Sequence, residues 1–522
     1  LKNIFAYDAK HKFAAVAAVT MIKAYYRLRR WNRVEEWARK LISKGNFKYK
    51  SRDDLETYIA IAIHEHSMDL SRARKHSEAI TESMRLVKEF RKKNKELAAK
   101  SLMNVGVLYE RARDVKLAVK TYERVLKEFK GTTVAPEAQY TIGMIYESQT
   151  RFKEASAAFL KMSKFKKHPK APDAIANAGL IREAMRDYSG AIKAFNQYEK
   201  LFPKNDDVPD VNFKIGLLYE RIGGAKSLAK AVKHYQSFAK KYSDRYVMKV
   251  EAYSRAGDIL RRLDVAKTHS KRNLNKEGKP KRMIFKNRRK AIVLFENALA
   301  EFPKAVQLIA TMKGGEKIGK AVTARRFVAQ SSYWLADYVF QDFDAVKIPG
   351  TLRVKILKTA LIDKANLHQE AEQAFDKVLP LRDAGWIACA AFRNGLLYYN
   401  FAKELFEVPI PFGLSPEQED EYRAALEEIG APVQEKSLVL LRAALKAAHD
   451  KGVYNTCAKD AGIFASKVSP EDFPITGDDQ LIPDKTKDTL LSANFIRTLK
   501  RGVTVVDMLK PTSKDAGAPE GK

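Results

Sequence analysis

The chain has 522 residues, with 96 Lys or Arg and 63 Asp or Glu, which gives a formal net charge of +33. Apolar residues make up 45% and charged residues 30%, which is typical of a folded protein and excludes a disordered, collagen-like or disulfide-rich one. The longest apolar run, residues 13–22, is too short to cross a bilayer, which takes about twenty residues. The excess of cations indicates anionic surroundings, such as nucleic acid, lipid headgroups, cell-wall polymer or an acidic protein.

Residues 1–98 are expected to form degenerate helix pairs, in which Tyr25, Trp31 and Val34 fit a weak copy of the repeat that follows. The same region holds the sequence His64-Glu65-His66. Residues two apart in a helix point to different sides, so these two histidines cannot share a metal ion. We therefore expect no metal site in this region.

A pattern of Gly-x2-Tyr followed by Ala-x3-aromatic recurs five times in the middle of the chain, with Arg182 and Leu260 in place of the tyrosine in the third and fifth copies. The glycines, which are 37, 36, 37 and 41 residues apart, are Gly106, Gly143, Gly179, Gly216 and Gly257. The aromatic residues are Tyr122, Phe159, Phe195, Tyr235 and Phe295. Gly removes a side chain where two helices cross, and the aromatic ring fills space beside it. The pattern therefore predicts antiparallel helix pairs that stack on one another.

These residues resemble the tetratricopeptide repeat (TPR) family. The resemblance implies an all-α, right-handed superhelical solenoid, and about 36 residues per pair would give roughly 12–14 pairs. A break is expected near residues 305–330, where Gly314-Gly315 interrupts the period. The expected segments are degenerate helices at 1–98, a regular array at 99–304, degenerate TPR-like helices at 305–468 and an extended or partly disordered tail at 469–522.

The resemblance also implies that positions five, nine, twelve and thirteen of each unit face a concave groove that binds partners. In this chain the predicted groove residues are Met103, Val107, Glu110, Arg111, Tyr140, Met144, Glu147, Leu180, Glu183, Phe213, Leu217, Glu220 and Arg221. Glutamate recurs at position twelve in four successive units. Such a row could hold a basic or extended peptide while the apolar residues contact its side chains. The alternative is that these glutamates are solvated helix-forming residues.

The family's chaperone-type members bind peptide carboxylates with a Lys and Asn clamp, and the resemblance places Met103 and Val107 at those positions. This departure argues against a receptor for chaperone tails.

The fifth unit carries a basic insertion, residues 264–290. Its densest cations form a predicted anion-binding arm, for which the alternative is a solvated loop. They are Lys279, Lys281, Arg282, Arg288, Arg289 and Lys290.

The segment from Gly314 to Ala321 reads G-x4-G-K-A, one residue short of a phosphate-binding loop. That loop needs a Ser or Thr hydroxyl where Ala321 stands, and it follows a buried strand. Here the preceding residues have a helical pattern, which favours a turn between helices. With no nucleophile motif elsewhere, the chain is expected to be neither an enzyme nor a cofactor-binding protein.

The chain has two cysteines, Cys389 and Cys457. Two are too few for a disulfide framework or a zinc site, so we expect inert or buried thiols. Scarce cysteine suits the cytosol and equally a bacterial periplasm. The chain begins at Leu1, which leaves room for a removed signal peptide or lipid anchor.

Tyr-Glu after the glycine and Phe-Pro-Lys after the second helix resemble TPR proteins of the Gram-negative envelope. Residues 447–474 resemble the ends of large TPR proteins of predatory and gliding bacteria. These resemblances imply a non-catalytic scaffold or adaptor that assembles a multiprotein complex, in the periplasm or on the periplasmic face of the outer membrane. Its partners would be proteins or peptides, with possible contact with anionic cell-wall or membrane material. The alternative is a basic helical solenoid that binds RNA, which would account for the net charge, and the alternative location is the cytoplasm.

Overall fold

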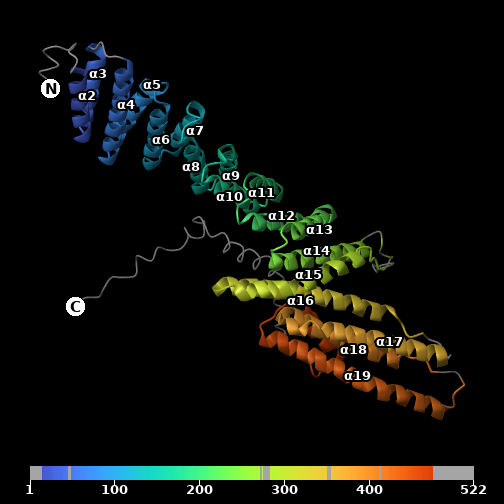
Figure 1. Cartoon of the computed structure of the whole chain (residues 1–522). Coiled ribbons are helices and arrows are strands. Elements are labelled where there is room, and N and C mark those ends of the chain that lie inside the picture. The colour runs from blue at the N-terminus through green and yellow to red at the C-terminus, as the bar shows by residue number, and fades with distance from the viewer. Residues whose placement is uncertain are drawn as a thin grey trace, which may run out of the picture. The chain divides into compact units, whose positions relative to one another are not determined.

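The computed structural model describes residues 14–44, 49–270, 273, 275, 283–349, 354–410 and 413–473. All regular elements within these ranges are helices (Figure 1). They form two compact units, Leu1–Val208 and Pro209–Lys522. The all-α solenoid predicted from the sequence is confirmed. Of the predicted tail, residues 474–522 lie outside the described part of the chain.

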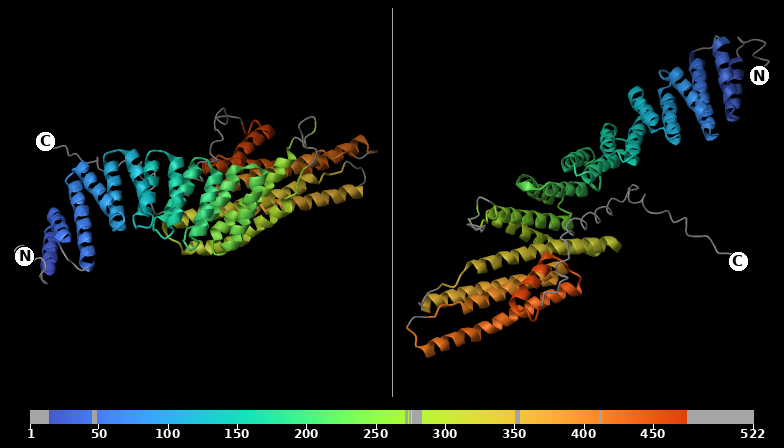
Figure 2. Two further views of the ribbon diagram at one scale, coloured as in Figure 1. Left: turned by 90° about the horizontal axis from the view of Figure 1, so that it is seen from above. Right: turned by 180° about the vertical axis from the view of Figure 1, so that it is seen from behind.

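The first unit is a stack of antiparallel helix pairs in chain order (Figures 1 and 2). A short 3-10 helix, η1 (Lys161–Phe165), follows α9. The pairs are α2 (Ala14–Arg27) with α3 (Trp31–Lys44), α4 (Tyr49–Arg72) with α5 (His76–Phe90), α6 (Lys95–Arg111) with α7 (Val115–Glu128), α8 (Ala135–Ser148) with α9 (Phe152–Leu160), and α10 (Ala171–Ala184) with α11 (Tyr188–Leu201).

The second unit continues the same plan and ends with a single helix, α20 (Thr456–Val468), that contacts α18 and α19. A 3-10 turn, η3 (Leu379–Leu381), precedes α18. The pairs are α12 (Val208–Ile222) with α13 (Gly224–Lys241), α14 (Tyr246–Thr268) with α15 (Arg288–Thr311), α16 (Gly314–Ala345) with α17 (Val354–Asp376), and α18 (Ala384–Phe406) with α19 (Pro416–Asp450).

The described residues thus form nine helix pairs and α20, fewer pairs than a uniform 36-residue period gives. The difference arises from long helices in the second unit, where α16 has 32 residues and α19 has 35. The boundary between the units, at 208–209, falls inside the array predicted at 99–304. Around residues 305–330, α14, α15 and α16 share one core that includes Val250, Ala305 and Val328.

The repeated glycines allow an aromatic ring of the second helix to lie directly on the first helix. A Cβ atom added at Gly106, Gly143, Gly179, Gly216 or Gly257 would lie 2.4–2.6 Å from the nearest ring atom of the same pair. The rings are at most 1% exposed, and they are Tyr122, Phe159, Phe195, Tyr235 and Phe295. Real Cβ atoms essentially never come so close to another atom, so a side chain at this crossing would displace the ring, which agrees with the glycine spacing of the sequence.

Within each pair of the first unit, the two helices are joined by a turn that contains one residue in the left-handed conformation. The backbone N–H of this residue donates to a carbonyl oxygen near the end of the first helix, as Arg113 N does to Glu110 O at 2.9 Å. Glycine usually fills such a position, but here the residues, with φ between 54° and 61°, are Arg29, Arg74, Arg113, Thr150 and Arg186. None of the described helices is long and apolar enough to cross a membrane.

Candidate functional site

The first helices α6, α8 and α10 each carry predicted partner-binding residues on one face. Spacings of four and three residues place such side chains one above the other on a helix. All of those on these three helices except Arg111 are partly exposed: Met103, Val107 and Glu110 on α6, Tyr140, Met144 and Glu147 on α8, and Leu180 and Glu183 on α10. We call this surface the first-helix wall of unit 1. Arg111, at the end of α6, is exposed.

In the second unit one of the same positions on α12 is buried. Phe213 is only 4% exposed. Its ring lies 5.4 Å from that of Tyr235 and 5.2 Å from that of Phe238. Phe213 therefore belongs to the core and not to a surface that a partner could reach, which corrects its assignment from the sequence. Leu217 and Glu220 are partly exposed, and Arg221 is exposed.

The glutamate row is not a set of equivalent free carboxylates. Glu110 accepts a hydrogen bond from the hydroxyl of Tyr122, and burial together with this bond raises the pKa of Tyr122. Glu220 accepts a hydrogen bond from the hydroxyl of Tyr235 at 2.6 Å. Glu183 also interacts within the chain. Three of the four glutamates therefore have intramolecular partners.

Glu147 differs from these three. The aromatic residue of its pair is Phe159, which has no hydroxyl, and the pair of Glu183 likewise has Phe195. Glu183, however, interacts with another group of the chain, whereas the carboxylate of Glu147 has no partner among the described residues. Burial raises the pKa of Glu147, and no neighbouring charge offsets that effect. Glu147 is thus a partly buried carboxylate that is still accessible from the first-helix wall.

A network of buried ion pairs occupies the corresponding face of the second unit. Arg255, whose side chain is 11% exposed, lies 2.8 Å from Glu251 and 3.4 Å from Glu220. Its guanidinium also lies over the ring of Phe327, and that of Arg261 lies 3.6 Å from the ring centre of Trp334. These arginines stabilise the packing of α14 on α16. The sequence analysis missed them, although Glu251 and Arg255 have the spacing of a helical ion pair.

The predicted anion-binding arm is divided by the structure. Lys279, Lys281 and Arg282 lie outside the described residues. Arg288 begins helix α15, donates to the carbonyl oxygen of Tyr338 at 2.9 Å and pairs with Asp342. Its charge is therefore used within the fold, which corrects its assignment to the arm.

Arg289 and Lys290 lie in the first turn of α15 and line a cavity of about 490 Å³ in the second unit. Lys240 of α13 contributes a third cation to this cavity. The other lining residues are Gln236, Tyr253, Val293, Leu294 and Asn297. The cavity is therefore lined by three cations and no carboxylate, which suits an anionic ligand.

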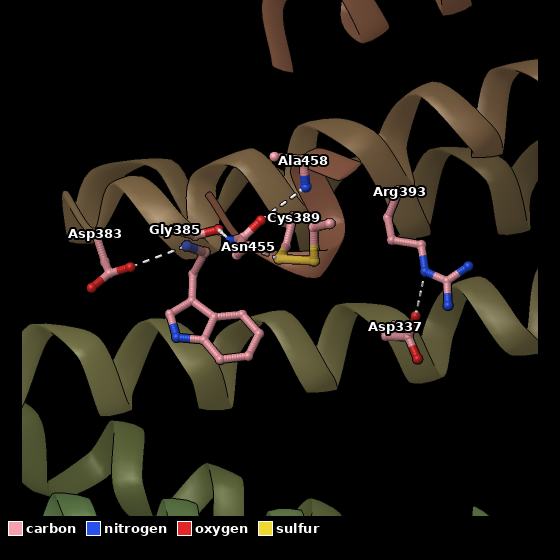
Figure 3. Close-up of a disulfide and its surroundings, with 9 residues drawn as sticks. Asp337, Asp383, Gly385, Cys389, Arg393, Asn455 and Ala458 are labelled. Carbon is pink, nitrogen blue, oxygen red and sulfur yellow. Dashed lines mark hydrogen bonds and ion pairs between the residues drawn. A yellow bond between two sulfur atoms is a disulfide. The ribbon is translucent and has the colours of Figure 1, made fainter. Parts of the chain in front are cut away.

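Cys389 and Cys457 form a disulfide that joins α18 to the start of α20 (Figure 3). The prediction of two separate thiols was wrong, because α20 folds back and brings the Cα atoms within 5.0 Å. Asn455 strengthens this junction, since its side chain caps α20 at Ala458 N and donates to Gly385 O of α18. α20 is thereby fixed on the last helix pair by covalent and polar contacts.

The other motifs from the sequence lie in ordinary helices. The segment from Gly314 to Ala321 forms the first two turns of α16 and no strand precedes it among the described residues. His64 lies in α4, where its Nδ1 is 2.8 Å from the hydroxyl of Ser101. In the part of the chain that the structure describes, no three His, Cys, Asp or Glu residues are grouped as metal ligands.

One model of the tetratricopeptide repeat matches residues 100–132 and 210–245, and a second model of the same repeat matches residues 136–165. The matches coincide with pairs whose glycine and ring are packed as described above. The chain contains tetratricopeptide repeats. No curated protein matches its sequence.

Solved structures similar to this TPR protein share little sequence with it. MamA from Desulfovibrio magneticus is 18% identical, covers 36% of this chain and 96% of its own, and has a TM-score of 0.21. The C-terminal part of a TPR protein from Cytophaga hutchinsonii is 12% identical, with coverages of 58% and 98% and a TM-score of 0.24. A TPR protein from Parabacteroides merdae is 10% identical, with coverages of 70% and 98% and a TM-score of 0.24.

Proposed function

We propose that this TPR protein is a non-catalytic scaffold that holds partner proteins on the first-helix wall and assembles a multiprotein complex at the bacterial cell envelope. The observation that carries the proposal is the register of the wall. Apolar and acidic side chains recur at the same positions of α6, α8 and α10 and are partly exposed. TPR arrays typically bind peptides or proteins, and a periodic wall of this kind suits an extended segment.

The disulfide supports the proposed location. Disulfides persist in oxidising compartments, which include the bacterial periplasm, and are rare in the cytosol. Cys389 is only 3% exposed and bonded to Cys457, so the bond belongs to the folded core of the last pair. An extracytoplasmic site would keep this bond oxidised.

Site-specific photo-cross-linking tests the scaffold proposal. A photoreactive amino acid at Met144, on the first-helix wall, should capture partner proteins in the source cells. The matched control is the same group at Lys120, an exposed residue of α7. Nuclease treatment should not change the captured proteins. Equal capture from both positions, or capture that requires RNA, would overturn the proposal.

Binding of a polyanion is a second candidate function, and the basic cavity of the second unit supports it. If the cavity binds RNA, the affinity should fall steeply as salt rises, because each phosphate contact releases counterions. Replacing Lys240 and Arg289 by Gln should then weaken binding. Replacing Lys226 and Lys233, which lie on α13 outside the cavity, should have a smaller effect. Equal losses in the two variants would assign RNA binding to overall charge and not to the cavity.

A further inference from the structure

In two helix pairs, the glutamate at position twelve of the unit accepts a hydrogen bond from a tyrosine of the second helix. In the pair of α6 and α7, the hydroxyl of Tyr122 donates to Glu110. In the pair of α12 and α13, the hydroxyl of Tyr235 donates to Glu220 at 2.6 Å. Each glutamate lies four residues after the glycine on which the ring packs. The ring and the carboxylate therefore form one unit within each pair.

The pair of α8 and α9 keeps the geometry but lacks the donor. The ring of Phe159 would lie 2.5 Å from a Cβ at Gly143, and that of Tyr122 lies at 2.4 Å from one at Gly106. The two rings thus occupy equivalent places, and only the hydroxyl is missing. Among the described residues, none forms a hydrogen bond or ion pair with the side-chain carboxylate of Glu147.

We infer that Glu147 binds a lysine or arginine side chain of an extended partner segment lying on the first-helix wall of unit 1. The inference rests on the proposed scaffold function and adds to it the chemistry of the partner. A cationic side chain would supply the donor that Phe159 lacks, in a charge-assisted hydrogen bond. Tyr140 and Met144, on the same face of α8, offer apolar surface to the aliphatic part of that side chain.

The net charge of the chain favours binding of one specific cationic residue at Glu147 over a general electrostatic attraction of basic segments. The chain as a whole carries a net charge of +33 and repels basic segments. A basic residue is therefore held only where a local carboxylate has no competing partner. Glu110 and Glu220 already accept hydrogen bonds, and Glu220 lies 3.2 Å from Arg262 as well. Glu147 is the member of the row that remains available to a ligand.

The test uses the full chain and an array of terminally blocked dodecapeptides of random sequence, each made with a central Lys and with a central Gln. The wild-type protein should bind Lys members about tenfold more tightly than their Gln partners, which is the usual size of one charge-assisted bond. Glu147→Gln should reduce this ratio to about one. Phe159→Tyr should also reduce it, because the new hydroxyl would donate to Glu147 as that of Tyr122 does to Glu110.

Tyr122→Phe is the reciprocal control, because it frees Glu110 and should leave the preference for Lys unchanged or increase it. Tyr and Phe both occur at this position in the chain, so both exchanges are compatible with the fold. Equal binding of Lys and Gln members by the wild-type protein, or an unchanged ratio in Glu147→Gln, would overturn the inference and leave the scaffold function standing. No peptide binding together with no cross-links at Met144 would overturn both.

Discussion

The pairs from α6 to α11 and the helices from α16 to α20 are stabilised in different ways. In the first group each pair uses the same contact, an aromatic ring against a glycine, as with Phe159 on Gly143. In the second group this contact is found once, with Phe406 on Gly430, and the other contacts are of different kinds, among them a disulfide and a buried lysine, Lys364. A repeated contact needs only two residues of one pair. The single contacts join long helices that do not follow the 36-residue repeat. They stabilise the packing where the repeated glycine–ring contact is missing.

Removal of the disulfide is expected to have the largest effect on the stability of the second group of helices relative to the first. Replacing both Cys389 and Cys457 by Ser opens a loop whose ends are 68 residues apart, and the chain-entropy model assigns such a loop about 4 kcal/mol of unfolding free energy. Hydrogen exchange followed by mass spectrometry should show faster exchange in α18 and α20. Exchange in α6 to α11 serves as the internal control, and a uniform increase there would contradict the separation of the two regions.

Lys364 is expected to have the next largest effect. Its side chain is 0% exposed, and Nζ donates to the carbonyl oxygens of Phe343 and Val346 and lies 3.1 Å from Glu404. Lys364→Met leaves these groups without a donor, which should cost about 3 kcal/mol. Denaturant unfolding measures the loss. Lys358→Met, at an exposed position of the same helix, should change little, and equal effects would show that the buried contacts are not responsible.

His368 should make the second region sensitive to acid. It lies 4.4 Å from the ring of Tyr398 and 5.1 Å from that of Phe401. Burial lowers the pKa of His368 to about 4, Glu372 opposes this shift, and Lys436 and Lys364 reinforce it. The folded protein therefore favours neutral His368. The contribution of His368 to the free energy of unfolding is fully present above the unfolded pKa of 6.5 and is lost as the pH falls toward 4.

The loss between pH 7 and pH 5 should be about 2 kcal/mol, because each pKa unit corresponds to about 1.4 kcal/mol. Denaturant unfolding at the two pH values measures it. His368→Phe should remove this part of the pH dependence. An equal pH dependence in the wild type and in this variant would assign the acid sensitivity to other groups.

Gly143 should show the smallest effect, and it concerns the repeated contact. Gly143→Ala places a Cβ 2.5 Å from the ring of Phe159. Overpacking costs about 1–3 kcal/mol, and the better helix propensity of Ala returns about 1 kcal/mol, so a net loss of about 1 kcal/mol is expected. Gly131→Ala is the control, since nothing lies within 4 Å of an added Cβ there. A more stable Gly143→Ala protein would show that the ring moves freely.

The repeated contact could be predicted from the sequence because it lies within one pair. Gly143 and Phe159 are 16 residues apart, and the same combination recurs along the chain. The period also gave the register of Glu147 on α8. It could not reveal that Glu147 lacks a partner, since only the structure shows that the hydroxyl of Tyr122, which Phe159 lacks, donates to the equivalent Glu110.

The single contacts could not be predicted in this way. Cys457 lies on α20, which has no counterpart in the repeat, so no period connects it with Cys389. Arg288 pairs with Asp342, which lies 54 residues further along the chain. Phe213 was predicted to face the groove from its position in the repeat alone, whereas it packs against the rings of Tyr235 and Phe238. Each of these contacts depends on how distant helices meet in space.

The position of the disulfide has a consequence for the order of biosynthesis. A ribosome makes Cys389 before the whole of α19 and makes Cys457 only afterwards. The two thiols therefore cannot meet until α19 has been synthesised and α20 has reached α18. Formation of the bond marks the moment at which α20 has docked on α18, so a nascent chain interrupted within α19 carries an unpaired thiol at Cys389.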